Sequence, residues 1–323
     1  MKKSKIILTS IMAVSLLSSC ASTPAANDST VEKNHKSHST EKHQKIEVIE
    51  ETPEDKFIKT LEGISIKNTG TPKEVVNGKD FASPFTFQVT DKDGAPVADF
   101  AVTLTYPASK TDDNINFDSL NLRTDENGNI SFTADTTSFA AKSKITVYPT
   151  PDTDSKTLLE RVKAFSAQAD WKVRSNIASK GAVLFIWDFN EKDRPVNNSY
   201  DVQAEFRSRG ISMVGNGPVN ETSYIGKPQT LYKETYEIIG GNQYGYLIYG
   251  TIKFEQPVTA LEDGDGYNCI LKSEMAAVSM KNGSKIYSSE ITYESIGKNW
   301  NECVSKGKSK LAELVVNDIL YGL

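Results

Sequence analysis

The sequence predicts a multidomain chain, in which an all-β sandwich over residues 55–176 is followed by an α/β (α+β) domain over residues 180–323. Short segments of alternating apolar and polar residues, separated by turn motifs, run through the first region, as is typical of sandwiches. The second region begins with a continuous apolar segment at residues 182–187 and ends with an amphipathic helical pattern. These patterns predict a mixed sheet with two main helices in the second domain, and 323 residues are enough for two domains.

Residues 1–19 have the features of a secretory signal peptide. Three lysines among the first five residues precede the apolar segment 6–14, which is too short to span a bilayer. The tetrad Leu-Ser-Ser-Cys at residues 17–20 resembles the lipobox of bacterial lipoproteins. The resemblance implies cleavage before Cys20 and attachment of acyl chains, palmitate among them, which would anchor the mature chain to a membrane. The alternative is an ordinary cleaved signal peptide with an incidental cysteine.

Residues 20–54 are predicted to form a disordered tether, because they contain no aromatic residue and are rich in Ser, Thr, Glu and Lys. His35, His38 and His43 lie in this segment and could bind a transition metal weakly, but a solvated linker is the simpler interpretation. The residue after Cys20 is alanine, not the aspartate that retains some bacterial lipoproteins at the inner membrane. We therefore expect the protein in the bacterial cell envelope, anchored to the outer membrane on its periplasmic face or at the cell surface.

The predicted strands of the sandwich alternate with tight turns. Residues 85–89 alternate apolar and polar side chains, and residues 91–94 (Asp-Lys-Asp-Gly) form a turn motif. The other segments of this pattern are strands and one further turn, expected at residues 97–106, 124–129, 130–134, 145–148 and 163–173. The motifs at residues 91–97 and 124–132 resemble the bacterial Ig-like and transthyretin-like repeats of surface proteins. This resemblance implies an Ig-like sandwich and no particular ligand.

In the C-terminal domain, the apolar segment 182–187 predicts a strand that is buried on both faces. A helix is predicted to follow from residues 197–199 to 209, and Gly210 is placed to end it. Asn282 and Gly283 predict a type I′ turn, which would join two strands into an antiparallel hairpin. The remaining elements are expected to be strands at residues 211–214, 244–254, 267–280 and 286–296, and a terminal helix from residue 300.

Three of these segments, at residues 185–189, 246–252 and 285–290, resemble the characteristic strands of a bacterial envelope superfamily. Its members include the curli secretion lipoprotein CsgG, the flagellar protein FlgT, the penicillin-binding-protein activator LpoB and the N-terminal domain of TolB. The resemblance covers the C-terminal domain and brings no catalytic residues with it. The chain departs from the superfamily pattern by an insertion at about residues 215–243, so the resemblance does not imply a partner.

Composition excludes several classes of function. No histidine lies beyond residue 43, which excludes a Ser-His-Asp triad, a Cys-His dyad and a His-based zinc site from the predicted domains. We therefore expect no catalytic residue, no cofactor and no metal site. The net charge of -5, without long runs of one sign, gives no indication of a nucleic-acid surface. Cys269 and Cys303 could form a disulfide or remain as two buried free thiols, and both alternatives stay open.

These features favour a non-catalytic, lipid-anchored lipoprotein that acts as a scaffold or regulator of an envelope complex, in cell-wall synthesis, secretion or motility. Its partners are expected to be the membrane, through the lipid, and an envelope protein. The alternative is a surface-exposed adhesin that binds a host or matrix partner through the sandwich. An enzyme that uses a pair of carboxylates is the least favoured alternative, with candidate acids at Asp188, Asp193, Asp263 and Asp265.

Tyrosines cluster in and around the insertion, beginning at Tyr224. Tyrosine-rich segments are common at protein interfaces, because the ring supplies apolar contact area and the hydroxyl remains hydrated. Ordinary packing against strands is the alternative. The predicted interface comprises Tyr232, Tyr236, Tyr244 and Tyr246.

Overall fold

The computed structural model describes residues 51–323, with the exception of residues 112–113, 199, 242 and 263. The predicted signal peptide, the lipid attachment at Cys20 and most of the predicted tether lie outside the described residues.

The first described element is the helix α1 (Pro53–Thr60), at the boundary predicted between the tether and the sandwich. A capping box starts this helix: the backbone N–H of Asp55 donates to the hydroxyl of Thr52, and the backbone N–H of Thr52 donates to the Asp55 carboxylate. Pro53 occupies the first helical turn, where a missing N–H costs nothing. The described structure therefore contains a helix that the sequence analysis did not predict.

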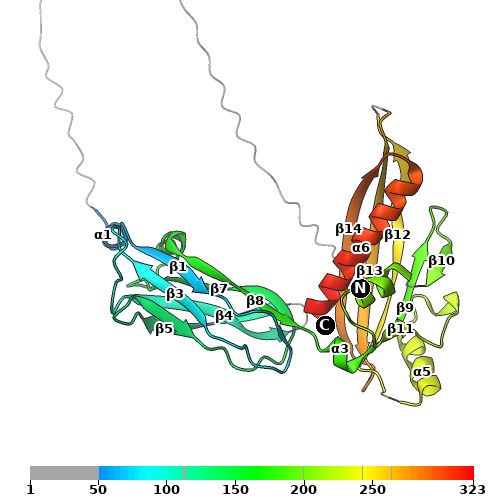
Figure 1. Cartoon of the computed structure of the whole chain (residues 1–323), viewed down its shortest axis with the longest axis horizontal. Helices are drawn as coiled ribbons and strands as arrows, with labels where there is room; N and C mark the ends of the chain where they lie inside the picture. The colour runs from blue at the N-terminus through cyan, green and yellow to red at the C-terminus, as the bar shows by residue number, and fades with distance from the viewer. Residues whose placement is uncertain (1–50, 112–113, 199, 242, 263) are drawn as a thin grey trace, which may run out of the picture. The chain divides into compact units, whose positions relative to one another are not determined.

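Eight strands form the N-terminal domain, and they are β1 (Ser65–Gly70), β2 (Val75–Val76), β3 (Phe85–Thr90), β4 (Ala101–Thr111), β5 (Asn114–Arg123), β6 (Asn129–Phe132), β7 (Ala141–Pro149) and β8 (Ala167–Arg174). They make a three-stranded sheet in the order β1–β3–β6 and a five-stranded sheet in the order β2–β8–β7–β4–β5 (Figure 1). Neighbouring strands are antiparallel, except that β2 runs parallel to β8. The predicted sandwich is therefore present as two sheets of unequal size.

One apolar core lies between these two sheets. Phe85, Phe87 and Val89 alternate along β3 and are fully buried, as the alternating sequence predicts. Trp171 of β8 comes from the opposite sheet and stacks on Phe85, with ring centroids 5.7 Å apart and ring planes within 10°. Such offset aromatic pairs add roughly 0.5–1.5 kcal/mol beyond the area that they bury. The sheets are thus joined at the centre of the core by a pair of aromatic rings.

The two predicted acidic turns are present and have the same construction. The Oδ1 atom of Asp91 accepts the backbone N–H groups of Asp93 and Ala95, both at 2.9 Å. The Oδ1 atom of Asp125 accepts the backbone N–H groups two and four residues further on, at 2.9 Å and 2.7 Å. Each carboxylate thereby substitutes for a backbone acceptor and stabilises its own turn.

The predicted strand over residues 163–173 is wrong in its first part. The helix α2 (Lys156–Val162) runs into a short 3-10 turn, η1 (Lys163–Phe165), and β8 begins only at Ala167. Leu158 and Val162 of α2 are fully buried in a small cluster with Leu61 and Tyr148. These two buried residues are four positions apart, a spacing that favours a helix over a strand. The alternating pattern in the sequence therefore predicts a strand that begins too early.

The sheet of the C-terminal domain is mixed, as predicted. Its strands are β9 (Ala182–Phe189), β10 (Pro195–Asn198), β11 (Val214–Asn216), β12 (Tyr246–Ala260), β13 (Tyr267–Ser279) and β14 (Lys285–Gly297). The order is β10–β9–β12–β13–β14, with β11 also paired to β9. β9 is parallel to β11 and β12, whereas β12, β13 and β14 form an antiparallel meander. The predicted hairpin after residue 280 is confirmed by the pairing of β13 with β14. The predicted type I′ turn is wrong, because that turn needs a positive φ at both central residues and here Gly283 (φ of 70°) has one whereas Asn282 does not.

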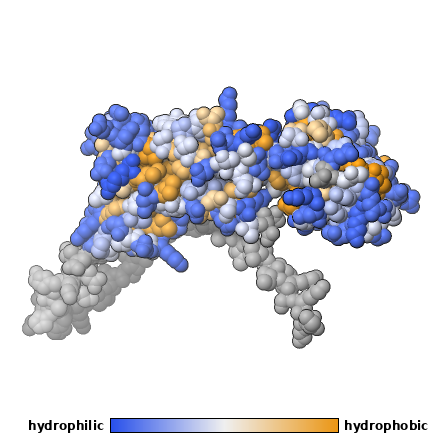
Figure 2. Space-filling model, turned by 90° about the horizontal axis from the view of Figure 1, so that it is seen from below, coloured by the Kyte–Doolittle hydropathy of each residue, from blue (hydrophilic) through white to orange (hydrophobic). Residues whose placement is uncertain are grey.

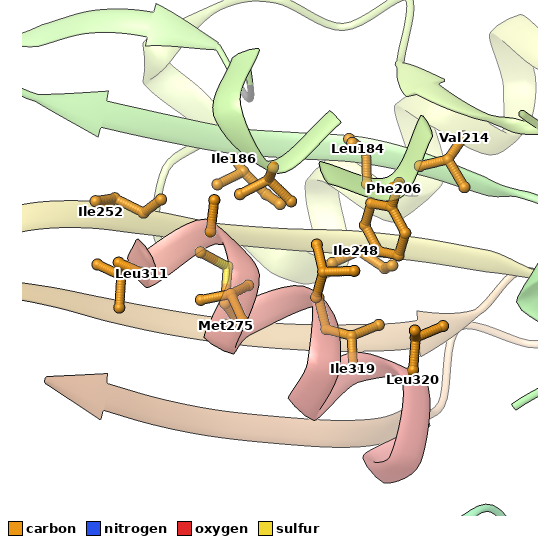
Figure 3. Close-up of a cluster of buried hydrophobic side chains, with 14 of the residues drawn as sticks. Leu184, Ile186, Phe206, Val214, Ile248, Ile252, Met275, Leu311, Ile319 and Leu320 are labelled. Atoms are coloured by element: carbon orange, nitrogen blue, oxygen red, sulfur yellow. The ribbon is translucent and has the colours of Figure 1, made fainter. Parts of the chain in front are cut away.

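Helices cover both faces of β9. α4 (Tyr200–Ser208) and α6 (Trp300–Gly322) pack against Leu184 and Ile186, together with Ile177 of the short helix α3 (Ile177–Lys180). Figure 3 shows apolar side chains of the helices and of the strands pointing toward one another in this cluster. On the other face, α5 (Pro228–Ile239) packs against Val183 and Phe185. The prediction of two main helices therefore missed α5, which lies in the insertion.

Gly250 lies on β12, in the segment 246–252 that resembles the envelope superfamily, and close packing explains why this position is a glycine. A Cβ atom at this position would lie 2.2 Å from the carbonyl oxygen of Glu274 and 2.6 Å from the sulfur of Met275, both on β13. Real Cβ atoms do not approach backbone atoms this closely, so any side chain would push β13 away from β12. The glycine is therefore required by close packing of two neighbouring strands.

We predict that Gly250→Ala lowers the free energy of unfolding of the C-terminal domain by roughly 1–3 kcal/mol, because the added methyl group overpacks the sheet. Thr251→Ala, at the next position of β12, is the matched control and should change the free energy of unfolding by less than about 0.5 kcal/mol. Urea unfolding followed by circular dichroism measures both variants. An equal effect of the two substitutions would contradict the role assigned to Gly250.

Candidate interaction site

The insertion between β11 and β12 folds as α5, and local sequence explains where this helix begins and ends. Pro228 lies in the first turn, and Gly240 ends the helix in the left-handed conformation, with φ of 77°. Leu231 and Thr235 are buried and hold the helix against the sheet. The last turn carries Ile238, which is 59% exposed.

A groove of about 400 Å³ lies beside the end of α5. Met213, which is 47% exposed, and Ile238 lie on it, together with Pro218 and Tyr244. Two large exposed apolar side chains in one groove are more than the isolated surface residues that soluble proteins commonly show. We call the set Met213, Pro218, Ile238 and Tyr244 the α5 groove.

The strand β11 adds a hydrogen-bonding edge to the α5 groove. β11 is paired with β9 and, among the described strands, with no other. Gly215 and Gly217 line the groove, so no side chain covers the backbone at these two positions, and the N–H of Gly217 donates to the backbone oxygen of Leu184 at 3.1 Å. An extended peptide could therefore use backbone hydrogen bonds for affinity and apolar side chains for specificity, as in strand addition.

The structure divides the predicted tyrosine interface. Tyr232 and Tyr236 lie on α5 with ring centroids 5.7 Å apart, and Tyr244 lines the α5 groove. Tyr246 packs instead on the core under α4 and α6, where its hydroxyl donates to Oδ1 of Asn176 at 2.6 Å. The hydroxyl of Tyr232 donates to the backbone oxygen of Met280, which identifies this side chain as part of the packing of α5.

Met213 and Ile238 were not singled out from the sequence. The signal for Ile238 was present, because the apolar pair at residues 238–239 directly precedes a helix-ending glycine. No comparable signal marks Met213, whose exposure depends on how the chain enters β11.

In addition to the α5 groove, the C-terminal domain has a buried ion pair at the carboxyl end of β9. Asp188 is only 2% exposed, and Nζ of Lys308 on α6 donates to its Oδ2 at 3.3 Å. Burial raises the pKa of Asp188, Lys308 opposes this shift, and the nearby Asp201 adds to it. A groove of about 590 Å³ beside this pair is lined by Asp201, Trp300, Ser305 and Lys308.

The other candidate acids are not gathered around Asp188. Asp193 forms an ion pair with Lys253 at 3.0 Å, and Asp263 lies outside the described residues. Asp265 lies in the turn between β12 and β13. Among the candidate acids that the structure describes, Asp188 and Asp193 each form an ion pair with a lysine. This arrangement differs from that of a hydrolase in which two carboxylates face each other across the substrate.

Cys269 and Cys303 are free thiols, and both are buried. The thiol of Cys303 donates to the backbone oxygen of Ser295 at 3.2 Å, and that of Cys269 donates to the backbone oxygen of Cys303 at 3.6 Å. Burial raises the pKa of Cys269 to about 12, so the reactive thiolate is disfavoured. Of the two alternatives left open by the sequence, the structure contains the pair of free thiols.

No group of three or more His, Cys, Asp or Glu side chains that could hold a metal ion is found among residues 51–323 as far as they are described. In the same part of the chain, no helix is both long and apolar enough to cross a membrane.

Two family models match parts of the chain. Residues 181–320 match the C-terminal domain of TP0693-like lipoproteins, and residues 59–158 match Ig-like domain 6 of SMCHD1. No curated protein matches the chain. The first match coincides with the C-terminal domain and supports a bacterial lipoprotein of the cell envelope.

Solved structures are also similar to part of the chain. The PelC dodecamer from Paraburkholderia phytofirmans is 18% identical, with 45% of this chain and 88% of that chain covered and a TM-score of 0.29. Lipoprotein GNA1162 from Neisseria meningitidis is 16% identical, with 43% and 97% covered and a TM-score of 0.23. Protein CT253 from Chlamydia trachomatis is 10% identical, with 43% and 93% covered and a TM-score of 0.25. At these values we draw nothing about function from them.

We predict that Lys308→Met lowers the free energy of unfolding at pH 7 by roughly 3–5 kcal/mol, because it leaves Asp188 charged and buried without a partner. Denaturant unfolding at several pH values measures the effect. The pKa of Asp188 is higher in the folded state than in the unfolded state. Ionisation of Asp188 therefore lowers the free energy of unfolding as the pH rises from the unfolded-state pKa to the folded-state pKa. The loss in Lys308→Met should therefore become smaller as the pH falls and Asp188 is protonated.

Two further variants control this experiment. Lys306→Met removes a lysine of the same helix whose side chain is mostly exposed, and it should change stability little. Asp188→Asn combined with Lys308→Met removes both charges and should recover much of the loss. Equal losses in the single and the double variant would show that the charge of Asp188 is not the cause.

The state of the two cysteines predicts a pattern of alkylation. In the native full-length chain without reductant, iodoacetamide should leave Cys269 and Cys303 unmodified, because both thiols are buried and burial also raises the pKa of Cys269. After unfolding in the same reagent, still without reductant, both should be alkylated, as peptide mass spectrometry will detect. Peptides that become alkylated only after reduction would identify a disulfide instead.

Proposed function

We propose that this protein is a lipid-anchored, non-catalytic lipoprotein of the bacterial envelope that acts as a scaffold or regulator of an envelope complex. The complex would belong to cell-wall synthesis, secretion or motility. The observation that carries the proposal is the α5 groove, where Met213 and Ile238 are exposed beside the free edge of β11. A groove of this kind suits an extended segment of a protein partner.

The membrane anchor supports the same function. The lipobox-like segment before Cys20 and the match of residues 181–320 to a lipoprotein family model are independent of each other. A domain held to a membrane by a long tether searches a small volume, so its effective concentration toward a membrane partner is high. The alanine after Cys20 favours the outer membrane as the site of attachment.

The arrangement of charged groups supports a non-catalytic role. The three histidines of the chain all lie before residue 44, and the best-buried candidate acid, Asp188, is paired with Lys308. The C-terminal domain has the mixed sheet expected from its resemblance to the CsgG, FlgT, LpoB and TolB superfamily, and we assign it there. That resemblance brings no catalytic residue with it.

A surface-exposed adhesin is the alternative function. It is favoured by the match of residues 59–158 to an Ig-like domain and by the two-sheet architecture of the N-terminal domain, which we assign as Ig-like. Such sandwiches have unrelated functions in different proteins, so the fold alone does not identify a ligand. Protease treatment of intact cells separates the alternatives, because an adhesin is cleaved and a periplasmic scaffold is protected.

We predict that Met213→Lys and Ile238→Lys each lower the recovery of the envelope partner at least tenfold, because each places a charge in the apolar groove. The measurement is crosslinking in intact cells, followed by affinity purification of the full lipoprotein and quantitative mass spectrometry. Ile296→Lys is the matched control, since Ile296 is also 59% exposed but lies on β14.

The control should recover the partner at the level of the unmodified chain. Recovery that is unchanged in the two groove variants would overturn the assignment of the partner to the α5 groove. Loss of the protein from protease-treated intact cells, with no envelope complex recovered, would favour the adhesin.

A further inference from the structure

The strand β5 is an exposed edge of the N-terminal domain. It is ten residues long, it ends the five-stranded sheet, and it pairs with β4 and with no other described strand. Phe117 is 52% exposed and Leu120 is 39% exposed, and these are the two large apolar residues of the described sandwich that stand out to solvent. In the view of Figure 2, apolar side chains (orange) gather on the sandwich, which lies at the left.

Natural edge strands usually carry features that prevent pairing, such as lysines, prolines or an inward-pointing charge. The sequence of β5, Asn-Ile-Asn-Phe-Asp-Ser-Leu-Asn-Leu-Arg, contains neither lysine nor proline. The irregularity in its pairing with β4 falls between Pro107 and Ser109, so the extra residue belongs to β4. β5 itself is a regular edge without lysine or proline, and Asp118, on the same face as Leu120, is its one inward-pointing charge.

The two faces of β5 are fixed by its pairing with β4. Leu120 lies opposite Leu104, and Leu122 lies opposite Val102, and both partners are fully buried in the core of the sandwich. Even-numbered residues of β5 therefore continue the inner face of the sheet, and odd-numbered residues lie on the outer face. Any strand that pairs with β5 must continue both faces.

We propose that β5 pairs antiparallel with β5 of a second copy of this chain, with Leu120 on the two-fold axis. A two-fold axis perpendicular to the sheet places residues of equal parity opposite one another, so inner faces join inner faces. With Leu120 opposite Leu120 of the second copy, Ser119 lies opposite Asn121, and Phe117 lies opposite Arg123. The two five-stranded sheets become one continuous sheet of ten strands.

The side chains favour this register over the one centred on Asp118. In this register Leu120 meets Leu120, Ser119 meets an amide, and Asp118 meets Leu122. Phe117 meets the guanidinium of Arg123, which also pairs with Asp99 of its own chain at 3.0 Å, and a cation–π contact is expected there. A shift of the axis to Asp118 would place two carboxylates opposite each other, and like charges directly opposite destabilise a strand pair. The occupant is therefore a second copy, because the strand is complementary to itself.

The expected dimer is weak in solution and favoured at a membrane. Seven residues of each strand overlap in this register, from Phe117 to Arg123, so the interface is smaller than the roughly 1,600 Å² of a standard stable complex. Two chains anchored to one membrane share a thin layer, which raises their effective concentration. This inference uses the sandwich and is independent of the partner that the α5 groove would bind.

The test is disulfide crosslinking of the full chain in intact bacterial membranes, with Leu120→Cys as the reporting variant. In the proposed register the two new cysteines face each other on the axis, so copper phenanthroline should give a covalent dimer on non-reducing gels. Asn116→Cys is the matched control, since it lies on the same strand and is exposed. Its two copies would be eight strand positions apart, about 27 Å, and should crosslink at least tenfold less.

A second variant tests the outer face. Phe117→Lys, introduced together with Leu120→Cys, places a lysine opposite Arg123 of the second copy and should lower the crosslinked fraction at least fivefold. Equal crosslinking of Leu120→Cys and Asn116→Cys would overturn the proposal, and so would the absence of a dimer from both. Capture of a different polypeptide by Leu120→Cys, identified by mass spectrometry, would also overturn it and assign the edge to another partner.

Discussion

The C-terminal domain depends on burial of β9 on both of its faces. Leu184 and Ile186 point to one side and Val183 to the other, and all of them are almost completely removed from water. Burying such side chains contributes roughly 1.5–3 kcal/mol each, but only if helices cover both faces of the strand. The insertion that carries α5 is therefore part of the core. The groove lies beside the last turn of α5, between Ile238 and the residues around β11.

The same strand also sets the position of the longest helix. Asp188 is the single charged residue in the apolar run of β9, and Lys308 reaches it from α6. The apolar stripe of α6, with Leu311, Val315 and Ile319 buried, would tolerate small shifts along the helix axis. A buried ion pair does not, because a misplaced lysine leaves a buried carboxylate without a partner. Packing of the apolar stripe and the Asp188–Lys308 pair thus both hold α6 on β9.

The N-terminal domain follows a different constraint, which is the unequal size of its sheets. Three strands cannot cover five, so the inner face of β5 extends beyond the smaller sheet and Leu120 stays 39% exposed. The two domains therefore offer different surfaces. The C-terminal domain has an apolar groove beside a short strand edge, which suits a foreign segment. The sandwich has a long edge that is complementary to itself.

Local signals in the sequence determined much of the fold. Alternation at residues 85–89, the continuous apolar run of β9 and the start of the terminal helix at residue 300 each depend on neighbours within a few residues, and the structure contains all three. The acidic turns at Asp91 and Asp125 are local in the same sense. Such local signals determine whether a segment becomes a helix, a strand or a turn, because their physical cause lies within the segment itself.

The remaining features were decided by tertiary structure. β5 is rich in asparagine, which disfavours strands, and it is a strand because β4 supplies its hydrogen bonds. Tyr236 and Tyr246 are close in sequence, yet they lie on opposite faces of the sheet. The two cysteines are buried thiols in the structure, and each donates to a backbone oxygen that only the folded chain brings near it. The α5 groove joins residues from β11, α5 and the loop before β12, and only the packing of these elements brings its exposed side chains together.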